Sequence, residues 1–520
     1  MCRKSERIGQ GVIVSTCDET RNGQRSTQKE ALSWPKVQDS PSHHRSALLF
    51  SSRRMHSAAG TPDITALKKT IESHFPDLWP AVSVGLATCA TLLLAENANP
   101  TALIYVGGPS TGKTTVASMF EGATITVQGT PQELCYRTDK FTPAAFVSQA
   151  ANRTSAQLKN VDLLPRIKDK VLLTPELAPI FRGKDDELTN TFSIITRVLD
   201  GQGLQTDSGT HGQRGYGGPH LFAWIGCTTP FEARVWKIMS QLGSRLFFLV
   251  MQAGSKVTLE RLLALGAGPS YQERLAACRV TVHVFLRDLF SAHGEVRSVR
   301  WSNESDESEA RRWLARCAML LAAMRTVPAE EREPSGKTVY RAGCAEGPER
   351  ALAVLTNLAR GYALVHGRRG VVMDDVPLIV AVTVSSIPGD ASAIFRAAVE
   401  KGGKLGAADI RVLLGAEHLE TARARMRFLD AVGVLELVNQ GSGKPGFLRF
   451  RPDWEWCASQ DFRRLLLGPA EGVTEPEPCE ALEAVSPEGV CTKLTTPNLA
   501  KHQKRERRRG KRAAHTGPEK

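Results

Sequence analysis

Apolar residues along this chain change their spacing from one region to the next. Between residues 101 and 252, short apolar runs alternate with segments whose apolar residues recur at helical spacing. The runs lie at 102–106, 171–173, 221–225 and 246–251. Strands that alternate with helices in this way are typical of a parallel sheet covered by helices. The pattern therefore predicts an α/β domain in this part of the chain.

Helical patterns flank the α/β region on both sides. Residues 61–97 are helical in pattern, with Asp63 as the expected N-cap, and residues 256–387 are mostly helical. Further helical patterns at 391–401, 407–414 and 418–432 precede the two arms of an expected hairpin, at 434–438 and 446–450. Three helices followed by a two-stranded wing predict a winged-helix module at 389–455.

Both ends of the chain lack this patterning. Residues 1–60 are rich in Ser, Arg, Gln and Thr, and we expect a disordered basic extension. Residues 1–54 are either a dispensable extension or an overextended start. Residues 456–520 are expected to be a disordered tail, in which 501–512 hold eight Lys and Arg against one Glu. This run could bind nucleic acid, act as a localisation signal or simply be solvated.

Composition narrows the class of protein. The chain of 520 residues is 42% hydrophobic and 23% charged, as in ordinary globular proteins, and its net charge of +13 favours polyanionic partners. Eleven cysteines without zinc spacing suggest reduced thiols and a cytoplasmic location, with nucleoid or nuclear association left open. The longest apolar stretch, 81–95, is too short to span a bilayer, so no membrane partner is expected.

Candidate chemistry is concentrated directly after the first apolar run. Residues 107–114 have the G-x-x-x-x-G-K-T spacing of a phosphate-binding P-loop between a strand and a helix. The glycines let successive amide N–H groups turn toward an anion, and the helix N-terminus adds partial positive charge. Lys113 is expected to reach the β- and γ-phosphates of ATP, and the Thr114 hydroxyl to bind Mg²⁺. The predicted nucleotide-binding residues are Gly107, Gly108, Pro109, Ser110, Thr111, Gly112, Lys113, Thr114 and Thr115.

Three later residues suggest how the nucleotide is used. Glu176 follows the apolar run at 171–173, and a glutamate at the carboxyl end of a strand can polarise an attacking water. Thr229 follows the next run and precedes a proline, whereas Arg245 stands directly before the last run.

This order of elements resembles the AAA+ ATPases, in particular their minichromosome-maintenance and MoxR-type branch. The resemblance implies a helical lid at 256–388 after an ATPase core at 61–255, and a ring oligomer, with a hexamer as the favoured size. It also implies that Glu176 is the catalytic base, Thr229 sensor 1 and Arg245 the arginine finger for the neighbouring subunit's nucleotide. Arg350 would be sensor 2 in contact with the γ-phosphate, although an arginine at a helix start can simply be solvated.

Two positions depart from the family pattern. Pro175 stands where the family has an aspartate that supports Mg²⁺, a role in which Thr174 could substitute through a water. Thr229 stands where the family has asparagine, but its hydroxyl can still orient water. ATP hydrolysis remains the expectation, with a nucleotide-dependent switch that barely turns over as an alternative.

A glycine-rich segment and the winged-helix pattern are the candidate substrate contacts. Seven glycines lie between residues 200 and 220, where similar AAA+ proteins project a hairpin into the ring pore. A plain connecting loop is the alternative. The winged-helix candidates lie in the helix at 418–432 and at the wing tip, although such modules also bind proteins. The candidate nucleic-acid contacts are His211, Arg214, Tyr216, Arg423, Arg425, Arg427 and Lys444.

The sequence thus predicts an ATP-hydrolysing AAA+ protein that remodels or translocates nucleic acid, most simply DNA, as a helicase-like or mobile-element motor. The alternative from another class is a MoxR-like chaperone that remodels proteins and docks through its winged helix.

Overall fold

The fold was analysed in a computed structural model. It describes residues 63–148, 154–208, 212–243, 245–252, 258–334, 338–343, 346–441 and 445–468. The predicted N-terminal extension, the basic run of the tail, and the candidates His211 and Lys444 lie outside these residues.

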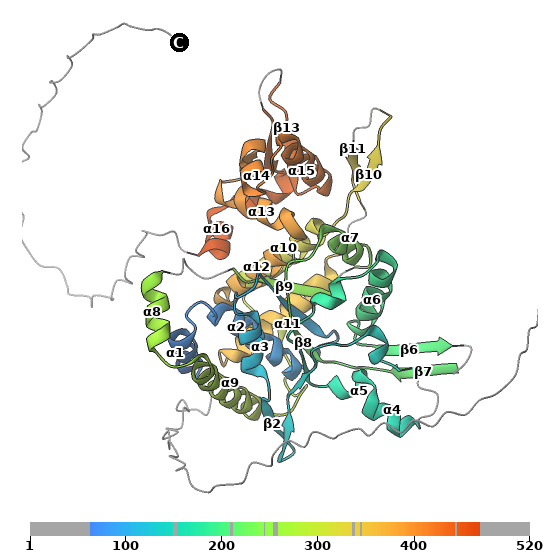
Figure 1. Ribbon diagram of the computed structural model, residues 1–520, viewed down its shortest axis with the longest axis vertical. Helices are drawn as coiled ribbons and strands as arrows, with labels where there is room; N and C mark the ends of the chain where they lie inside the picture. The colour runs from blue at the N-terminus through green and yellow to red at the C-terminus, as the bar shows by residue number, and fades with distance from the viewer. Residues whose placement is uncertain are drawn as a thin grey trace, which may run out of the picture. The chain divides into compact units, whose positions relative to one another are not determined.

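A five-stranded parallel sheet lies at the centre of the α/β domain (Figure 1). Its order is β4-β5-β8-β1-β9, formed by Cys135–Arg137, Val171–Thr174, Ala223–Thr228, Thr101–Val106 and Leu246–Val250. Strand β1 pairs in parallel with both β8 and β9, and all six of its residues are buried. The predicted α/β core is therefore confirmed, whereas the edge strand β4 has no apolar run and was not predicted.

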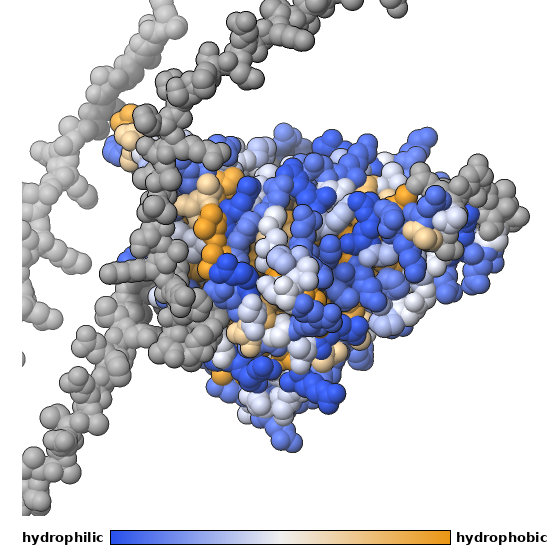
Figure 2. Space-filling model, turned by 90° about the horizontal axis from the view of Figure 1, so that it is seen from below, coloured by the Kyte–Doolittle hydropathy of each residue, from blue (hydrophilic) through white to orange (hydrophobic). Residues whose placement is uncertain are grey.

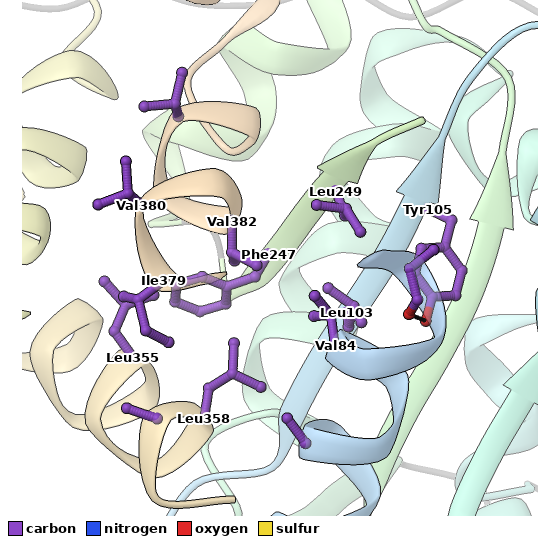
Figure 3. Packing of buried hydrophobic residues seen from close by; sticks show 14 of the residues in the cluster. Val84, Leu103, Tyr105, Phe247, Leu249, Leu355, Leu358, Ile379, Val380 and Val382 are labelled. Atoms are coloured by element: carbon purple, nitrogen blue, oxygen red, sulfur yellow. Dashed lines mark hydrogen bonds between the residues drawn. The ribbon is translucent and has the colours of Figure 1, made fainter. Parts of the chain in front are cut away.

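Side chains of β1 alternate between two separate hydrophobic cores. Leu103 and Tyr105 face a core with α2 (Trp79–Ala90), α11 (Glu349–Val365) and α12 (Val376–Ser385), part of which Figure 3 shows. The Tyr105 hydroxyl donates a hydrogen bond to the Ala81 carbonyl, 2.8 Å away. Ala102 and Ile104 face the second core, which includes α6 (Asp185–Val198) and α7 (Ala233–Gln241). Burial on both faces explains why the strand is continuously apolar.

Further helices pack around the P-loop side of the sheet. Helix α1 (Ile64–His74) begins at the predicted N-cap Asp63, whose side chain accepts hydrogen bonds from the amides of Thr65 and Ala66. Helix α9 (Tyr271–His293) packs against α1 and against α3 (Lys113–Phe120), the helix that follows the P-loop. Helices α8 (Leu259–Ala267) and α10 (Ser308–Met324) complete the predicted helical region before α11.

Several hairpins and short helices complete the core. The β6–β7 hairpin (Gly203–Ser208 with Gly212–Gly217) extends away from the sheet in Figure 1, as the glycine-rich segment suggested. The sequence patterns did not predict the two other hairpins, β2–β3 (Thr124–Val127, Thr130–Glu133) and β10–β11 (Ala329–Arg332, Thr338–Arg341). Helices α4 (Ser155–Val161) and α5 (Leu163–Ile167) precede β5.

The C-terminal helices and hairpin occur where they were predicted. They are α13 (Gly389–Glu400), α14 (Ala407–Leu413), α15 (Leu419–Val432), β13 (Leu435–Val438) and β14 (Phe447–Phe450). Strand β12 (Lys404–Gly406) adds a third strand in the order β12-β14-β13. The assignment of these elements as a winged-helix module stays a prediction.

The predicted disorder from residue 456 onward is wrong for its first part. A 3₁₀ segment (Pro452–Ala458) and helix α16 (Gln460–Leu467) continue the fold. Ser459 caps α16 through its hydroxyl, and Phe462 is fully buried, with its ring stacked on Trp313 at 6.0 Å. The eight residues of α16, four of them polar, precede a Pro- and Glu-rich segment, so their spacing alone does not distinguish a helix from the tail.

The surface and the cysteines agree with the composition. The face shown in Figure 2 is mostly hydrophilic, with a short strip of hydrophobic residues toward one side. Within the described ranges, none of the helices combines the length and the apolar character that a membrane span requires. The cysteines for which the structure gives a state are all buried and free: Cys89, Cys135, Cys227, Cys278, Cys317 and Cys457.

Candidate nucleotide-binding site

The P-loop connects the carboxyl end of β1 to the first turn of α3. The Gly107 amide donates to the Thr228 carbonyl of β8 at 3.2 Å, which fixes the start of the loop to the neighbouring strand. Lys113 is 8% exposed, and its Nζ donates to the carbonyls of Gly107 and Gly108 at 2.7 and 2.6 Å. The ammonium group therefore lies inside the loop, where P-loop proteins hold a phosphate.

The backbone of the loop requires glycine where the spacing predicted it. Gly112 is the N-cap of α3 at φ 86°, in the left-handed region, and a Cβ there would lie 2.5 Å from Leu78 Cδ2. Thr114 is exposed in the first helical turn, where its hydroxyl is accessible to Mg²⁺. The loop thus fits ATP with Mg²⁺ in backbone geometry and in side chains.

A cavity of about 670 Å³ lies beside the loop. Its lining includes Ser110, Thr111, Gly112 and Thr115, together with Phe75 after α1 and Arg274 of α9. The Phe75 and Tyr271 rings meet edge to face at 6.1 Å, and the Arg274 guanidinium lies 5.0 Å from the Phe75 ring centroid. The cavity therefore has an aromatic ring and a cation beside the phosphate loop, with Tyr271 packed behind the ring, and such a lining suits a nucleotide base.

Sequence reasoning missed Phe75 and Arg274 of the cavity and Tyr271 beside them. Phe75 follows α1, whereas Tyr271 and Arg274 belong to the start of α9, about two hundred positions later. The two segments nevertheless meet in space, because Arg274 Nη1 donates a hydrogen bond to the His74 carbonyl at 3.2 Å. No local spacing could have indicated the pair. The only available signal was the capping box at Ser270 and Glu273, which predicts where α9 starts but not what it contacts.

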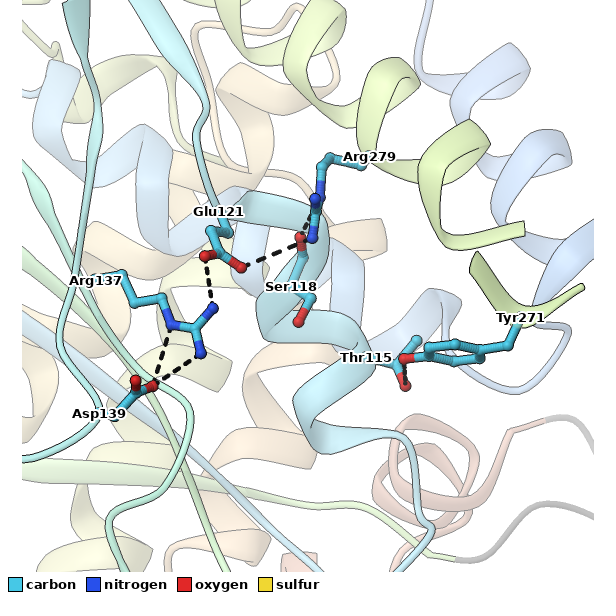
Figure 4. A network of polar contacts seen from close by, with 7 residues as sticks. All are labelled: Thr115, Ser118, Glu121, Arg137, Asp139, Tyr271 and Arg279. Atoms are coloured by element: carbon cyan, nitrogen blue, oxygen red, sulfur yellow. Dashed lines mark hydrogen bonds and ion pairs between the residues drawn. The ribbon is translucent and has the colours of Figure 1, made fainter. Parts of the chain in front are cut away.

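A polar network fixes α9 to the P-loop helix (Figure 4). Arg279 Nε donates to the Ser118 carbonyl at 2.9 Å, and Thr115 and Tyr271 share a hydrogen bond between their hydroxyls at 3.1 Å. Glu121 lies 2.6 Å from Arg137 and 3.7 Å from Arg279. Hydrogen bonds from Arg137 to Glu121 and Asp139 raise the pKa of that arginine. These contacts hold the base pocket at a fixed distance from the phosphate loop.

Glu176 lies at the same edge of the sheet as the P-loop. It follows β5, which pairs with β8, which in turn pairs with β1. Buried Cys227 lies between Glu176 and Lys113: burial raises its pKa to about 12, Lys113 lowers it and Glu176 raises it. Glu176 Oε1 accepts a hydrogen bond from the Ala178 amide at 2.8 Å, so part of its carboxylate stabilises the local turn.

The threonines at this edge have different environments. Thr229 follows β8 directly and is partly exposed, so its hydroxyl can meet a water near the loop. Thr174 is 1% exposed and accepts a hydrogen bond from Trp224 Nε1 at 2.8 Å. Because Thr174 is buried against Trp224, it cannot replace the missing aspartate at Pro175 through a bound water.

The two candidate arginines lie at the opposite edge of the sheet. Arg245 precedes β9, and Arg350 is in the first turn of α11. Both bind Asp200 Oδ1, from Arg245 Nε at 3.2 Å and from Arg350 Nη1 at 2.5 Å. They line a second cavity, of about 1000 Å³, which shares no residue with the P-loop cavity.

The separation follows from the parallel register. Ala102 at the start of β1 pairs with Leu246 at the start of β9, so Arg245 lies at the amino edge, whereas the P-loop follows the last residue of β1. At about 3.3 Å per residue, a strand of six residues separates the two edges by about 20 Å. Sensor 2 contact between Arg350 and the nucleotide of its own chain is therefore not formed; contact with a neighbour's nucleotide stays a prediction.

The candidate nucleic-acid contacts in the β6–β7 hairpin differ in environment. Tyr216 is half-buried and its hydroxyl donates to Asp162 Oδ2 at 2.8 Å; burial and this hydrogen bond raise the pKa of the tyrosine. The residue therefore attaches the hairpin to the α4–α5 segment. Arg214 is partly exposed on the same strand.

The arginines of α15 are held by carboxylates. Arg425 forms an ion pair with Asp390 of α13 and covers the Phe428 ring at 4.8 Å, so it is not available on an open face as the sequence suggested. Arg427 and Arg423 lie 2.8 and 3.6 Å from Glu420. Arg423 is 54% exposed and remains the most accessible of the three.

The described elements form an α/β fold that fits a P-loop-type core, with a cavity beside the loop. No protein-family model matches the chain, and no curated protein matches it. Among solved structures, a full-length MCM homolog from Methanopyrus kandleri is similar, with 13% identity and a TM-score of 0.33 over 63% of this chain. The chain spans 59% of that structure's length. A likeness of this size assigns no function, so the functional argument rests on the residues of the site.

Proposed function

We propose that this protein is an AAA+ ATPase that binds and hydrolyses ATP between adjacent copies of the chain and uses the energy to remodel or translocate nucleic acid. The observation that carries the proposal is the placement of two functional groups at opposite edges of one sheet. The P-loop with Glu176 lies at the carboxyl edge, and Arg245 with Arg350 lies at the amino edge.

Binding depends on the groups around the loop. The P-loop amides and Lys113 receive the phosphates, and the cavity lined by Phe75 and Arg274 receives the base. Mg²⁺ held by Thr114 would neutralise charge on the phosphates. Glu176 then orients the attacking water, with Thr229 beside it.

Assembly follows from the distance between the edges. Arginines that stabilise a γ-phosphate must approach it directly, and about 20 Å of sheet prevents this within one chain. A second copy that docks its arginine edge on the P-loop edge completes the site. Such a head-to-tail contact uses two different surfaces and, when the rotation closes, generates a ring.

Nucleic acid is proposed as the substrate because of charge and the projecting hairpin. The net charge of +13 favours a polyanion, and the β6–β7 hairpin extends from the sheet close to the arginine edge, directly after Asp200. Arg214 on this hairpin and Arg423 on α15 are the proposed phosphate contacts.

The test is ATP turnover with and without single- and double-stranded DNA at several salt concentrations. We expect stimulation by DNA that weakens steeply with salt. Arg245→Ala should abolish turnover but keep ATP affinity, and Lys113→Ala should lose both. A mixture of these two inactive chains should recover activity, since one supplies the arginines and the other the nucleotide. Full turnover by the Arg245 variant, or no recovery in the mixture, would refute the shared site.

A nucleotide-dependent switch is the second candidate, because of the environment of Glu176. Pro175 offers no carboxylate, Thr174 is buried against Trp224, and one Glu176 oxygen is bound to the Ala178 amide. A switch would bind ATP tightly and hydrolyse it only about once in 30–60 minutes, the rate of an unassisted GTPase. If Glu176→Gln leaves a measurable turnover unchanged, Glu176 is not the base.

A further inference from the structure

Asp200 is the carboxylate that both candidate arginines bind. Its Oδ1 accepts from Arg245 Nε at 3.2 Å and from Arg350 Nη1 at 2.5 Å, and its Oδ2 lies 3.8 Å from Arg197. The side chains of Asp200, Arg245 and Arg350 are 22, 15 and 37% exposed, so the pair of Asp200 with Arg245 is better shielded from water than its pair with Arg350. Sequence reasoning gave Asp200 no role.

The arginines need such a partner because positive charge accumulates here. Arg325 lies beside Arg245 and is 4% exposed. Its guanidinium donates hydrogen bonds to the carbonyls of Leu246 and Ser386. Burial lowers the pKa of Arg325 to about 10; Glu346 raises it, and the charge of Arg245 lowers it further. Guanidinium groups this close repel one another in a shielded site. A carboxylate that binds two of them at one oxygen offsets that repulsion.

The backbone gives Asp200 a fixed position. Its amide donates to the Arg197 carbonyl at 3.2 Å, which extends the last turn of α6. Gly201 follows at φ 73°, and a Cβ there would lie 2.4 Å from the Ala98 carbonyl. The chain therefore packs closely against the segment before β1, and the carboxylate projects from a rigid support.

We propose that Asp200 is a positioning residue of the shared ATPase site: it holds the guanidinium groups of Arg245 and Arg350 together, so that both meet the neighbouring subunit's γ-phosphate. Arg245 also donates from Nη1 to the carbonyls of Leu242 and Gly243, but a guanidinium has five N–H donors, so those on Nη2 can still meet a phosphate. Displacement of a catalytic group by 1 Å costs about 10²-fold in rate. The inference rests on the proposed function and concerns only the chain that donates the arginines.

The experiment places Asp200→Asn in one chain of a mixed assembly at a time. The donor chain carries Lys113→Ala and intact arginines, and the acceptor chain carries Arg245→Ala and an intact P-loop. Asp200→Asn in the donor should lower the recovered turnover about 10²-fold. In the acceptor it should leave the recovery intact, because that chain's arginine edge faces an inactive site. Asp207→Asn in the donor is the matched control, since Asp207 is an exposed aspartate in the β6–β7 hairpin that follows Asp200.

A fluorescent ATP analogue gives a second readout. The single variant Asp200→Asn should keep wild-type affinity for the analogue while its kcat falls, because the P-loop edge is unchanged. Equal losses in the donor and acceptor arms would indicate a folding role and overturn the inference, as would an unaffected donor arm. If the parent mixture without Asp200→Asn recovers no activity, the proposed shared site itself fails.

Discussion

Gly107→Ala and Gly108→Ala form a matched pair within the P-loop, and we expect opposite outcomes. A Cβ at Gly107 would lie 2.6 Å from the Met251 carbonyl and 2.6 Å from Thr111 Oγ1. A Cβ at Gly108 would meet nothing within 4 Å, and its φ is not positive. The two variants add the same methyl group to adjacent residues, so composition and helix propensity cannot explain a difference between them.

The magnitude follows from the contact at Gly107. Ordinary van der Waals contact begins at 3.4 Å, so the loop or the Met251 backbone must move by about 0.8 Å (3.4 minus 2.6). Overpacking of this kind costs about 1–3 kcal/mol. If the loop moves, its amides lose their alignment on the phosphates, and a cost of that size lowers ATP affinity by about 5- to 150-fold. Gly108→Ala restricts the unfolded chain and should leave stability unchanged or raise it by about 0.4–1 kcal/mol.

The assay is a titration with a fluorescent ATP analogue, together with thermal unfolding of both variants. We expect Gly107→Ala to bind at least about five times more weakly than Gly108→Ala. The reasoning fails if both variants bind like the wild type, or if Gly108→Ala loses as much affinity as Gly107→Ala. The second result would mean that the phosphates approach the loop from the side of the Gly108 Cβ.

Three further predictions concern the rest of the fold. Tyr216→Phe removes the hydrogen bond to Asp162 and should lower the free energy of unfolding by about 1.5–3 kcal/mol in urea; an unchanged midpoint would contradict the anchoring role. Burial and nearby arginines lower the pKa of His293 and His366, so both are neutral when folded. Their stabilisation is complete above about pH 6.5 and is lost as pH falls through the lowered pKa values, so the melting temperature should fall on acidification. Changing both histidines to Gln should flatten that dependence, whereas His418→Gln, at an 83% exposed side chain, should not. Arg425→Ala should lower the free energy of unfolding of the C-terminal elements by about 1.5–3 kcal/mol, because it removes the ion pair with Asp390. Arg423→Ala should instead weaken DNA binding and reduce the slope of log affinity against log salt by about 0.9. The reverse pattern would show that Arg425 is the DNA contact.

The sequence alone predicted the features that depend on neighbouring residues. Four strands of the central sheet are apolar because helices cover both faces, and Asp63 begins α1 because its carboxylate binds two nearby amides. The P-loop was predictable for the same reason: Lys113 donates a hydrogen bond to the Gly107 carbonyl six positions earlier, so the spacing of glycine and lysine defines the loop.

The edge strand β4 and helix α16 were not predictable in this way. β4 has three residues, one of them exposed, and α16 has two turns that depend on Phe462 packing against Trp313. Three residues are too few to establish a period, and the two turns of α16 stand directly before a Pro- and Glu-rich segment, so neither pattern outweighs its surroundings. Their structure depends on partners elsewhere in the chain.

Tertiary structure decided which of the candidate residues act together. Arg245 and Arg350 are about a hundred positions apart, yet they share Asp200 at the edge opposite the P-loop, because β1 and β9 run parallel. Phe75 and Tyr271 similarly meet beside the loop only because α9 packs on α3. Residue type and local spacing predicted the phosphate loop, because the hydrogen bonds from Lys113 to the carbonyls of Gly107 and Gly108 join residues at most six positions apart. Which arginines, rings and carboxylates surround the nucleotide depends on strand order and helix packing, which no short stretch of sequence contains.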